Sequence, residues 1–374
     1  MKKLSFIFCV IMLSAMAANA KIRRVGFFGT PVAGTDYTTF ANAHTAAAAN
    51  DTILVFPGST LEGTITKKLV IIGNGNWLDP NSTPKGNANQ QAFPSVSTTG
   101  TLTLGAGSDG TIIMGFNDGN YYINANDITL RRNRNITVYV AYTIYNINNL
   151  KILENYSVNL VNYASNAATI TNMNVSNNLM YQFAMGGTNT YSGNVSNNVW
   201  AYDNTSAGTN GGATTFSYPT GISFGNGAFL FQNNILVAYN NASAASNSNY
   251  FTFSGGGNSV FNYNIALQTS TLQNWGAGTG NMIVPTANVA SIFNAFPLIG
   301  SASADSRYQL KAGSPGLIAN RPGSSADAGM FGGPSPYKLS TLPSIPSIYQ
   351  LSSPQGNNPV GSSIQINLST KGNN

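Results

Sequence analysis

An asparagine recurs at a nearly constant interval through the middle of the chain, and this interval constrains the fold more than any other feature of the sequence. The segments 172–180 and 192–200 both contain Val-Ser-Asn-Asn. Aligned on the second Asn of that motif, the same position recurs at Asn133, Asn155, Asn178, Asn198, Asn234 and Asn264, with spacings of 22, 23, 20, 36 and 30 residues. A period of about 22 residues indicates a repeat architecture.

Apolar residues keep a fixed phase around this asparagine. The residues three positions before it are all apolar: Leu130, Ile152, Val175, Val195, Phe231 and Phe261. The residues one position after it are apolar in five of six repeats: Tyr156, Leu179, Val199, Ile235 and Ile265, with Arg134 as the exception. The positions two and four before it are mostly polar. This phase predicts a strand, a bend at the asparagine and a second strand.

A stack of coils satisfies this pattern. About 22 residues suffice for one coil of about three short strands, and successive coils stack ~4.8 Å apart through parallel strand pairing. The apolar column then fills the interior, and the asparagines form a ladder. Because Asn tolerates the left-handed backbone conformation, we expect the ladder asparagine itself to occupy the bend. The sequence therefore predicts an all-β solenoid, a parallel β-helix with ~22-residue coils and a short N-terminal cap helix.

Two further segments resemble the right-handed parallel β-helix proteins of the pectate-lyase-like superfamily. Asp36–Gly75, a short amphipathic helix followed by a strand ending in Pro-Gly and a Leu-Val-Ile-Ile-Gly segment, resembles the N-terminal cap of that group. Pro297–Gly333 resembles the closing segment of many secreted bacterial members. The resemblance implies a right-handed coil over about residues 36–333. It implies no single activity, because this fold carries lyases, hydrolases, adhesins and inert spikes.

The ends of the chain differ in composition from its middle. Residues 1–20 combine Lys2 and Lys3, an apolar run and Ala18-Asn19-Ala20, which predicts a signal peptide and a secreted protein, extracellular, cell-surface or periplasmic. We divide the rest into cap and first coils (21–75), β-helix (76–333) with insertions near 203–227 and 240–257, and a Pro/Ser-rich tail (334–374). This tail should leave the helix as an extended linker.

Charged residues are scarce, at 7% of the chain against a typical ~25%. The chain has no Lys/Arg stripe that could follow a phosphate backbone, so we expect no nucleic-acid partner. After the signal segment it has no apolar run near the ~20 residues of a membrane helix. Metal-ligand and cofactor signatures are also missing, and we expect no metal and no cofactor. The single histidine, His44, lies in the expected cap helix, where we assign it a capping or packing role.

One charged cluster remains as a candidate for catalysis. The alignment places Arg132 beside Glu154 and Lys151 beside Thr129. Since the lyases of the resembled superfamily use an Arg or Lys base with Ca²⁺ held by carboxylates, Arg132, Lys151 and Glu154 could be a reduced polysaccharide lyase site. The alternative is an exposed ion pair across adjacent strands, which stabilises by less than ~1 kcal/mol. Between Asn155 and Ala304 only Asp203 is charged, and this favours the ion pair.

The two long spacings indicate insertions. Against a coil of about 22 residues, 36 and 30 imply about 14 and 8 extra residues, projecting from the same corner of adjacent coils. These insertions and the residues just before them supply the candidate ligand-binding residues Trp200, Tyr202, Asp203, Tyr218, Tyr239 and Tyr250. Aromatic rings beside Asn and Ser side chains suit the apolar faces and hydroxyls of a sugar. The alternative is that these rings pack the insertions against the helix.

The sequence thus favours a non-catalytic secreted β-helix protein that binds glycan or another extracellular surface. One alternative is a polysaccharide lyase or glycoside hydrolase with a reduced charged site. A second alternative is a structural surface or filament protein, which the asparagine ladder and low charge would also suit. The irregular insertions count against a smooth fibre.

Overall fold

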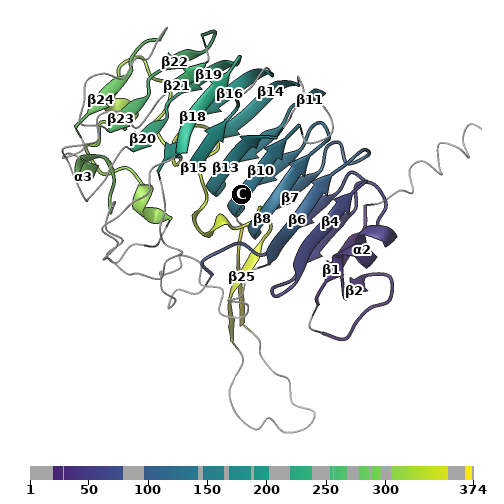
Figure 1. Ribbon diagram of the computed structural model, residues 1–374. Helices are drawn as coiled ribbons and strands as arrows, with labels where there is room; N and C mark the ends of the chain where they lie inside the picture. The colour runs from purple at the N-terminus through teal and green to yellow at the C-terminus, as the bar shows by residue number, and fades with distance from the viewer. Residues whose placement is uncertain are drawn as a thin grey trace, which may run out of the picture.

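The computed structural model describes residues 20–27, 29–78, 97–141, 146–163, 168–186, 189–201, 220–237, 253–255, 257–267, 278–285, 289–295, 303, 305–352 and 367–372. Most of the regular structure in these residues is parallel β-strand, in two sheets of twelve strands each (Figure 1). This confirms the all-β, parallel prediction. The expected signal segment, apart from Ala20, lies outside the described residues.

The two large sheets are named A and B, and each is built from strands along most of the chain. Sheet A consists of β1 (Ile22–Val25), β2 (Asp36–Tyr37), β3 (Thr52–Val55), β5 (Val70–Ile72), β7 (Ile112–Met114), β9 (Thr129–Arg131), β11 (Asn146–Asn148), β12 (Lys151–Leu153), β14 (Thr169–Ser176), β16 (Thr190–Ser196), β19 (Ala228–Gln232) and β22 (Val260–Asn262). Sheet B consists of β4 (Thr60–Ile65), β6 (Thr98–Leu104), β8 (Asn117–Ile123), β10 (Arg134–Val140), β13 (Tyr156–Asn162), β15 (Leu179–Ala184), β17 (Val199–Trp200), β18 (Thr220–Gly225), β20 (Ile235–Val237), β21 (Phe253–Gly255), β23 (Ile265–Leu267) and β24 (Met282–Val284).

The register of the strands follows the sequence repeat. From β3 onward the chain passes repeatedly from sheet A to sheet B and back, and strands one repeat apart pair in parallel. Ile152 of β12 lies between Leu130 and Val175, and Lys151 lies beside Thr129, as the alignment predicted. Such stacked coils are what a β-helix requires.

The predicted interior column is confirmed. Leu130, Ile152, Val175, Val195, Phe231 and Phe261 are all at most 6% exposed and belong to one core cluster between the sheets. The second apolar column lies elsewhere. Tyr156, Leu179, Val199, Ile235 and Ile265 are equally buried, but they form a separate cluster with residues from near the C-terminus. These five side chains open the strands of sheet B and pack outside the coil.

The bend between the sheets is made by the residue before the ladder asparagine. Arg132, Glu154, Asn177, Asn197, Asn233 and Tyr263 have φ between 55° and 59°, whereas no ladder asparagine has positive φ. The prediction that the ladder asparagine occupies the left-handed bend was therefore wrong. The left-handed residue bends the chain between the two sheets, and the amide of the next residue then bonds the neighbouring coils.

The N-terminal end is closed by the expected cap helix, α2 (Phe40–Ala46), which begins after the N-cap Thr39. Phe40 and Ala43 face the core. His44 Nε2 accepts a hydrogen bond from the Thr66 backbone N–H at 3.2 Å, so its side chain fastens the helix to the end of β4. In the described residues no helix is both long and apolar enough to cross a membrane.

Residues 305–342, the C-terminal strap, lie along the outside of the coils (Figure 1). The strap contains the short helices η3 (Ser306–Tyr308), η4 (Ile318–Asn320) and η5 (Leu339–Thr341), and follows α3 (Val289–Ile292). We expected residues from Pro334 onward to leave the helix as a linker, but Tyr337 is only 3% exposed and packs in the outer apolar cluster. The described chain ends in an antiparallel pair, β25 (Ser347–Ser352) and β26 (Asn367–Lys371).

Candidate functional site

The ladder asparagines form a continuous chain of buried amides between the sheets. Asn178 shows the pattern: its backbone N–H and its Nδ2 both donate to Asn198 Oδ1 at 3.0 Å, and Nδ2 also donates to the Ile152 carbonyl at 2.8 Å. The same bonds recur from Asn133 to Asn264, and the ladder ends at Asn281, outside the repeat recognised in the sequence. Each internal amide is satisfied by its neighbours, so the ladder offers nothing to a ligand.

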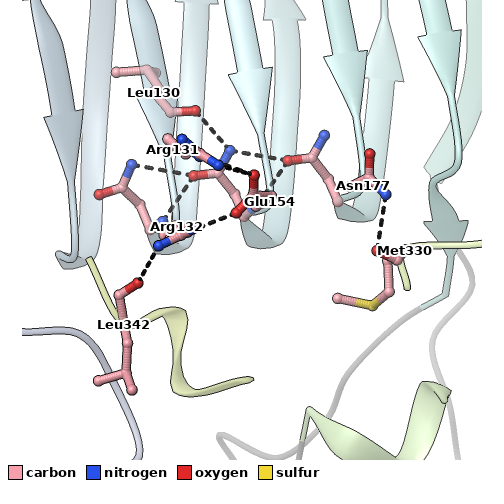
Figure 2. Close-up of polar contacts among 10 residues, drawn as sticks. Leu130, Arg131, Arg132, Glu154, Asn177, Met330 and Leu342 are labelled. Atoms are coloured by element: carbon pink, nitrogen blue, oxygen red, sulfur yellow. Dashed lines mark hydrogen bonds and ion pairs between the residues drawn. The ribbon is translucent and has the colours of Figure 1, made fainter. Parts of the chain in front are cut away.

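Several of the residues that precede a ladder asparagine contact the strap instead. Asn177 Nδ2 donates to the carbonyl of Met330 at 3.1 Å (Figure 2). It also donates to the carbonyl of Gly332 at 2.6 Å. Asn197 Nδ2 donates to the Asp327 carbonyl at 2.7 Å. The repeated Asn-Asn therefore has two separate roles, because the first amide binds the strap and the second binds the next coil.

Asn233 makes the same kind of contact through its amide oxygen. This atom accepts from Arg321 Nη2 at 2.8 Å and from Ser324 Oγ at 3.0 Å. Burial lowers the pKa of Arg321 to about 10, and the nearby Asp327 carboxylate partly offsets that effect. Together with Asn177 and Asn197, Asn233 forms a docking row for the strap.

The candidate catalytic cluster belongs to this docking row. Glu154 Oε1 accepts from Arg131 Nε and Nη2 at 2.9 and 2.5 Å, and Glu154 Oε2 accepts from Arg132 Nε at 2.6 Å. Arg132 Nη1 in turn donates to the carbonyl of Leu342 in the strap at 2.9 Å (Figure 2). Arg132 and Glu154 are both 0% exposed. The structure thus brings together Arg132 and Glu154 as the alignment predicted, but the expected exposed ion pair is buried.

This burial changes the chemistry open to the cluster. Burial lowers the pKa of Arg132, while its hydrogen bond to Glu154 and the charge of that carboxylate oppose the shift. Both Glu154 oxygens hold guanidinium groups, so the carboxylate is not presented to a substrate. No ion pair links Lys151 to a carboxylate in the part of the chain that the structure describes, and no three His, Cys, Asp or Glu residues gather there as a metal site. The geometry suits a structural clamp.

Of the candidate ligand-binding residues, the structure describes only Trp200. Tyr202, Asp203, Tyr218, Tyr239 and Tyr250 lie outside the described residues. Trp200 is described, and it is 0% exposed. Its ring lies 5.9 Å from those of Phe183 and Phe231, centroid to centroid, inside the coil. As the second residue of β17, Trp200 points inward while Val199 points to the strap. It therefore cannot contact a ligand at the surface.

The sequence reasoning missed an aromatic group on the outer face of sheet B. Tyr122 of β8 and Tyr139 of β10 are register partners whose rings stack at 4.8 Å with 18° between their planes. Tyr163, just after β13, meets both rings edge-on, at 6.0 and 5.4 Å between centroids. Tyr163 is 51% exposed. These three residues, the tyrosine cluster, have spacings of 17 and 24 residues, and only the strand register reveals that they share one face.

The side chains beside the tyrosine cluster are uncharged and mostly polar. The outer positions of β6, β8, β10, β13 and β15 form two columns across the coils. One contains Thr101, Asn120, Thr137, Asn159 and Gln182, and the other contains Thr103, Tyr122, Tyr139, Val161 and Ala184. This face combines aromatic rings with hydroxyl and amide groups and has no charge in either column.

Known proteins assign no role to these surfaces. The chain matches no family model, no curated protein and no solved structure. The charged clamp and the tyrosine cluster are therefore judged by their geometry alone.

Proposed function

We propose that this protein is a secreted, non-catalytic β-helix protein that binds glycan at its surface. The observation that carries the proposal is the engagement of Glu154 by Arg131 and Arg132. Proton abstraction beside a sugar acid needs a free base and a partner that stabilises the developing charge. In the described cluster the Glu154 carboxylate bonds the guanidinium groups of Arg131 and Arg132, and Arg132 also bonds the strap, so these groups serve stability.

Glycan is the ligand class that the exposed chemistry suits. On sheet A the outer positions of β14 and β16 include the partly exposed amides of Asn174 and Asn194, and sheet B adds tyrosines. Amides and hydroxyls match sugar hydroxyls, and aromatic rings match the apolar faces of sugar rings. Charged residues make up only 7% of the chain, so the sequence supplies no basic surface that would bind a phosphate backbone or an acidic partner.

We further propose that the coils wind right-handed, as in the pectate-lyase-like superfamily. Crossovers between parallel strands of one sheet are right-handed in about 98% of cases. The cap helix α2 and the parallel register of β3 to β22 support this kinship. A crystal structure of residues 21–374 with left-handed coils would contradict it.

A polysaccharide lyase remains the second candidate, because of Lys151. Its side chain lies on the outer face of sheet A beside Thr129 and Asn174, and it is partly exposed. A lysine base in that position would use Ca²⁺ from solution to stabilise a substrate carboxylate.

The two candidates are separated by one experiment on residues 21–374. A glycan array identifies bound sugars, and each hit is then incubated with and without Ca²⁺ while reducing ends and unsaturated products are measured. We expect binding without product. Product formation that Lys151→Ala abolishes, and that the exposed Lys311→Ala leaves intact, would establish the lyase instead. Fractionation of cells that express the full chain tests secretion.

A further inference from the structure

We infer that the tyrosine cluster, Tyr122, Tyr139 and Tyr163, is a binding site for a neutral sugar chain on the outer face of sheet B. This inference rests on the proposed function and assigns it a place. The site differs from the inserted segments between β17 and β18 and between β20 and β21, where the sequence placed the aromatics.

The geometry of the cluster leaves one of its three rings, that of Tyr163, about half exposed. Tyr122 and Tyr139 stack face to face from adjacent coils, so each hides part of the other. Tyr163 lies perpendicular to both, with 82° and 81° between ring planes, and retains 51% of its exposure. Two strands therefore hold the stacked pair, and the pair holds Tyr163. A preorganised ring loses little conformational entropy when it binds.

The neighbours of the rings supply hydrogen-bonding groups at the right position. Asn120 stands two residues before Tyr122, so both side chains point to the same face of β8. Asn120 and its register partner Thr101 are exposed. A sugar ring packed on an aromatic face presents hydroxyls around its rim, and an amide and a hydroxyl nearby can bond them.

The charges around the cluster select for a neutral ligand. Within β4, β6, β8, β10, β13 and β15 the charged residues are Glu62, Asp118 and Arg134. The Arg134 guanidinium lies 4.5 Å from the centroid of the Trp77 ring. Glu62, beside Gly100, and Asp118, two residues before Asn120, are both exposed. Two exposed carboxylates repel an acidic polysaccharide or nucleic acid at low salt, whereas a neutral glycan meets no such repulsion.

Affinity electrophoresis of residues 21–374 tests the site. The gels contain mixed-linkage β-glucan, xylan or polygalacturonate, and Kd is derived from the retardation of the folded protein. We expect retardation by at least one neutral polysaccharide. Tyr163→Ala should then raise Kd about tenfold, a loss of 1.4 kcal/mol. Tyr163→Phe keeps the ring and should stay within about threefold of the parent, since one weak hydrogen bond is at stake.

Val32→Ala is the matched control. Val32 is 53% exposed between β1 and β2, so this change removes an exposed apolar side chain away from the cluster and should leave Kd unchanged. If the parent binds but Tyr163→Ala and Tyr139→Ala bind equally well, the site is wrong while the proposed function stands. A parent retarded only by polygalacturonate overturns the neutral class. A parent that binds no polysaccharide on the array or in the gels overturns both. A Tyr163→Ala protein with a lower melting temperature and unchanged Kd shows that the cluster is structural.

Discussion

Asn177 and Asn178 are adjacent in the chain, yet their amides bond in opposite directions. Asn177 Nδ2 donates outward to the carbonyls of Met330 and Gly332 in the strap. Asn178 Nδ2 donates along the coil axis to Ile152 and to Asn198. The left-handed φ of 59° at Asn177 produces this division, because it turns the chain between the two side chains. The motif thus joins the coils to each other and to a segment about 150 residues away in sequence, as the separations of 153 and 155 residues show.

This division predicts unequal losses on mutation. Asn178→Ala removes the ladder bonds and leaves buried partners unsatisfied, so it should lower the free energy of unfolding by about 2–4 kcal/mol. Asn177→Gly removes the strap bonds but accepts the left-handed φ without strain, and should cost about 1–2 kcal/mol. Urea unfolding of residues 21–374 measures both. Equal values for the two variants would contradict the separate roles.

The buried ion pair predicts a large effect of Glu154. Glu154→Gln leaves Arg132 charged and buried without its counter-ion, which should cost about 3–5 kcal/mol. An exposed pair would cost less than ~1 kcal/mol. Guanidinium unfolding curves distinguish the two values. Asp36→Asn provides a comparison, because it weakens the pair with Arg24, whose side chain is partly exposed at 25%. A Glu154→Gln loss no larger than that of the comparison would show that the clamp is not buried in solution.

The strap covers an apolar surface of the coils, and its removal should expose that surface. A chain that ends at residue 302 lacks residues 305–342 and uncovers Tyr156, Leu179, Val199, Ile235 and Ile265. Exposed apolar patches of this kind bind hydrophobic dyes and promote association. We expect strong binding of anilinonaphthalene sulfonate and elution at a larger apparent size than the parent in gel filtration. A chain ending at residue 343 keeps the strap and should behave like the parent. A truncated protein that elutes like the parent and binds no dye would show that the strap covers no large apolar surface.

His44 predicts a pH dependence of stability. Burial, followed by the charge of Lys67, lowers the pKa of His44 below its ordinary value of 6.5. The folded protein therefore favours neutral His44, which accepts the Thr66 N–H. The contribution of neutral His44 to the free energy of unfolding is complete above pH 6.5. It is lost as pH falls toward the lowered pKa, because the unfolded chain binds the proton more tightly.

Melting temperatures between pH 5 and 7.5 measure this dependence. The chain has one histidine, so His44→Gln should flatten the profile over this range. Glutamine can still accept the Thr66 hydrogen bond through its side-chain oxygen, which makes the control conservative. An identical slope in parent and variant would assign the pH dependence to other groups.

The sequence alone determined the repeat, the strand phase and the interior column. Leu130, Ile152 and Val175 could be placed inside because each belongs to the same position of a local period, and coils stack only if that position stays in phase. The ladder could be predicted for the same reason. Its end at Asn281 was missed, because the last spacing of 17 residues departs from the period.

The tertiary structure decided everything that depends on the strap and on strand register. Arg132 and Glu154 looked like a surface pair because nothing within one coil covers them, whereas a contact across 210 residues does. That contact is made to the carbonyl of Leu342, and a backbone group leaves no signature in the sequence. Likewise, Tyr122, Tyr139 and Tyr163 share no motif and meet only because parallel pairing aligns β8 with β10 and β10 with β13. A local period specifies what repeats from coil to coil, but only the folded chain shows which faces are covered and which remain open.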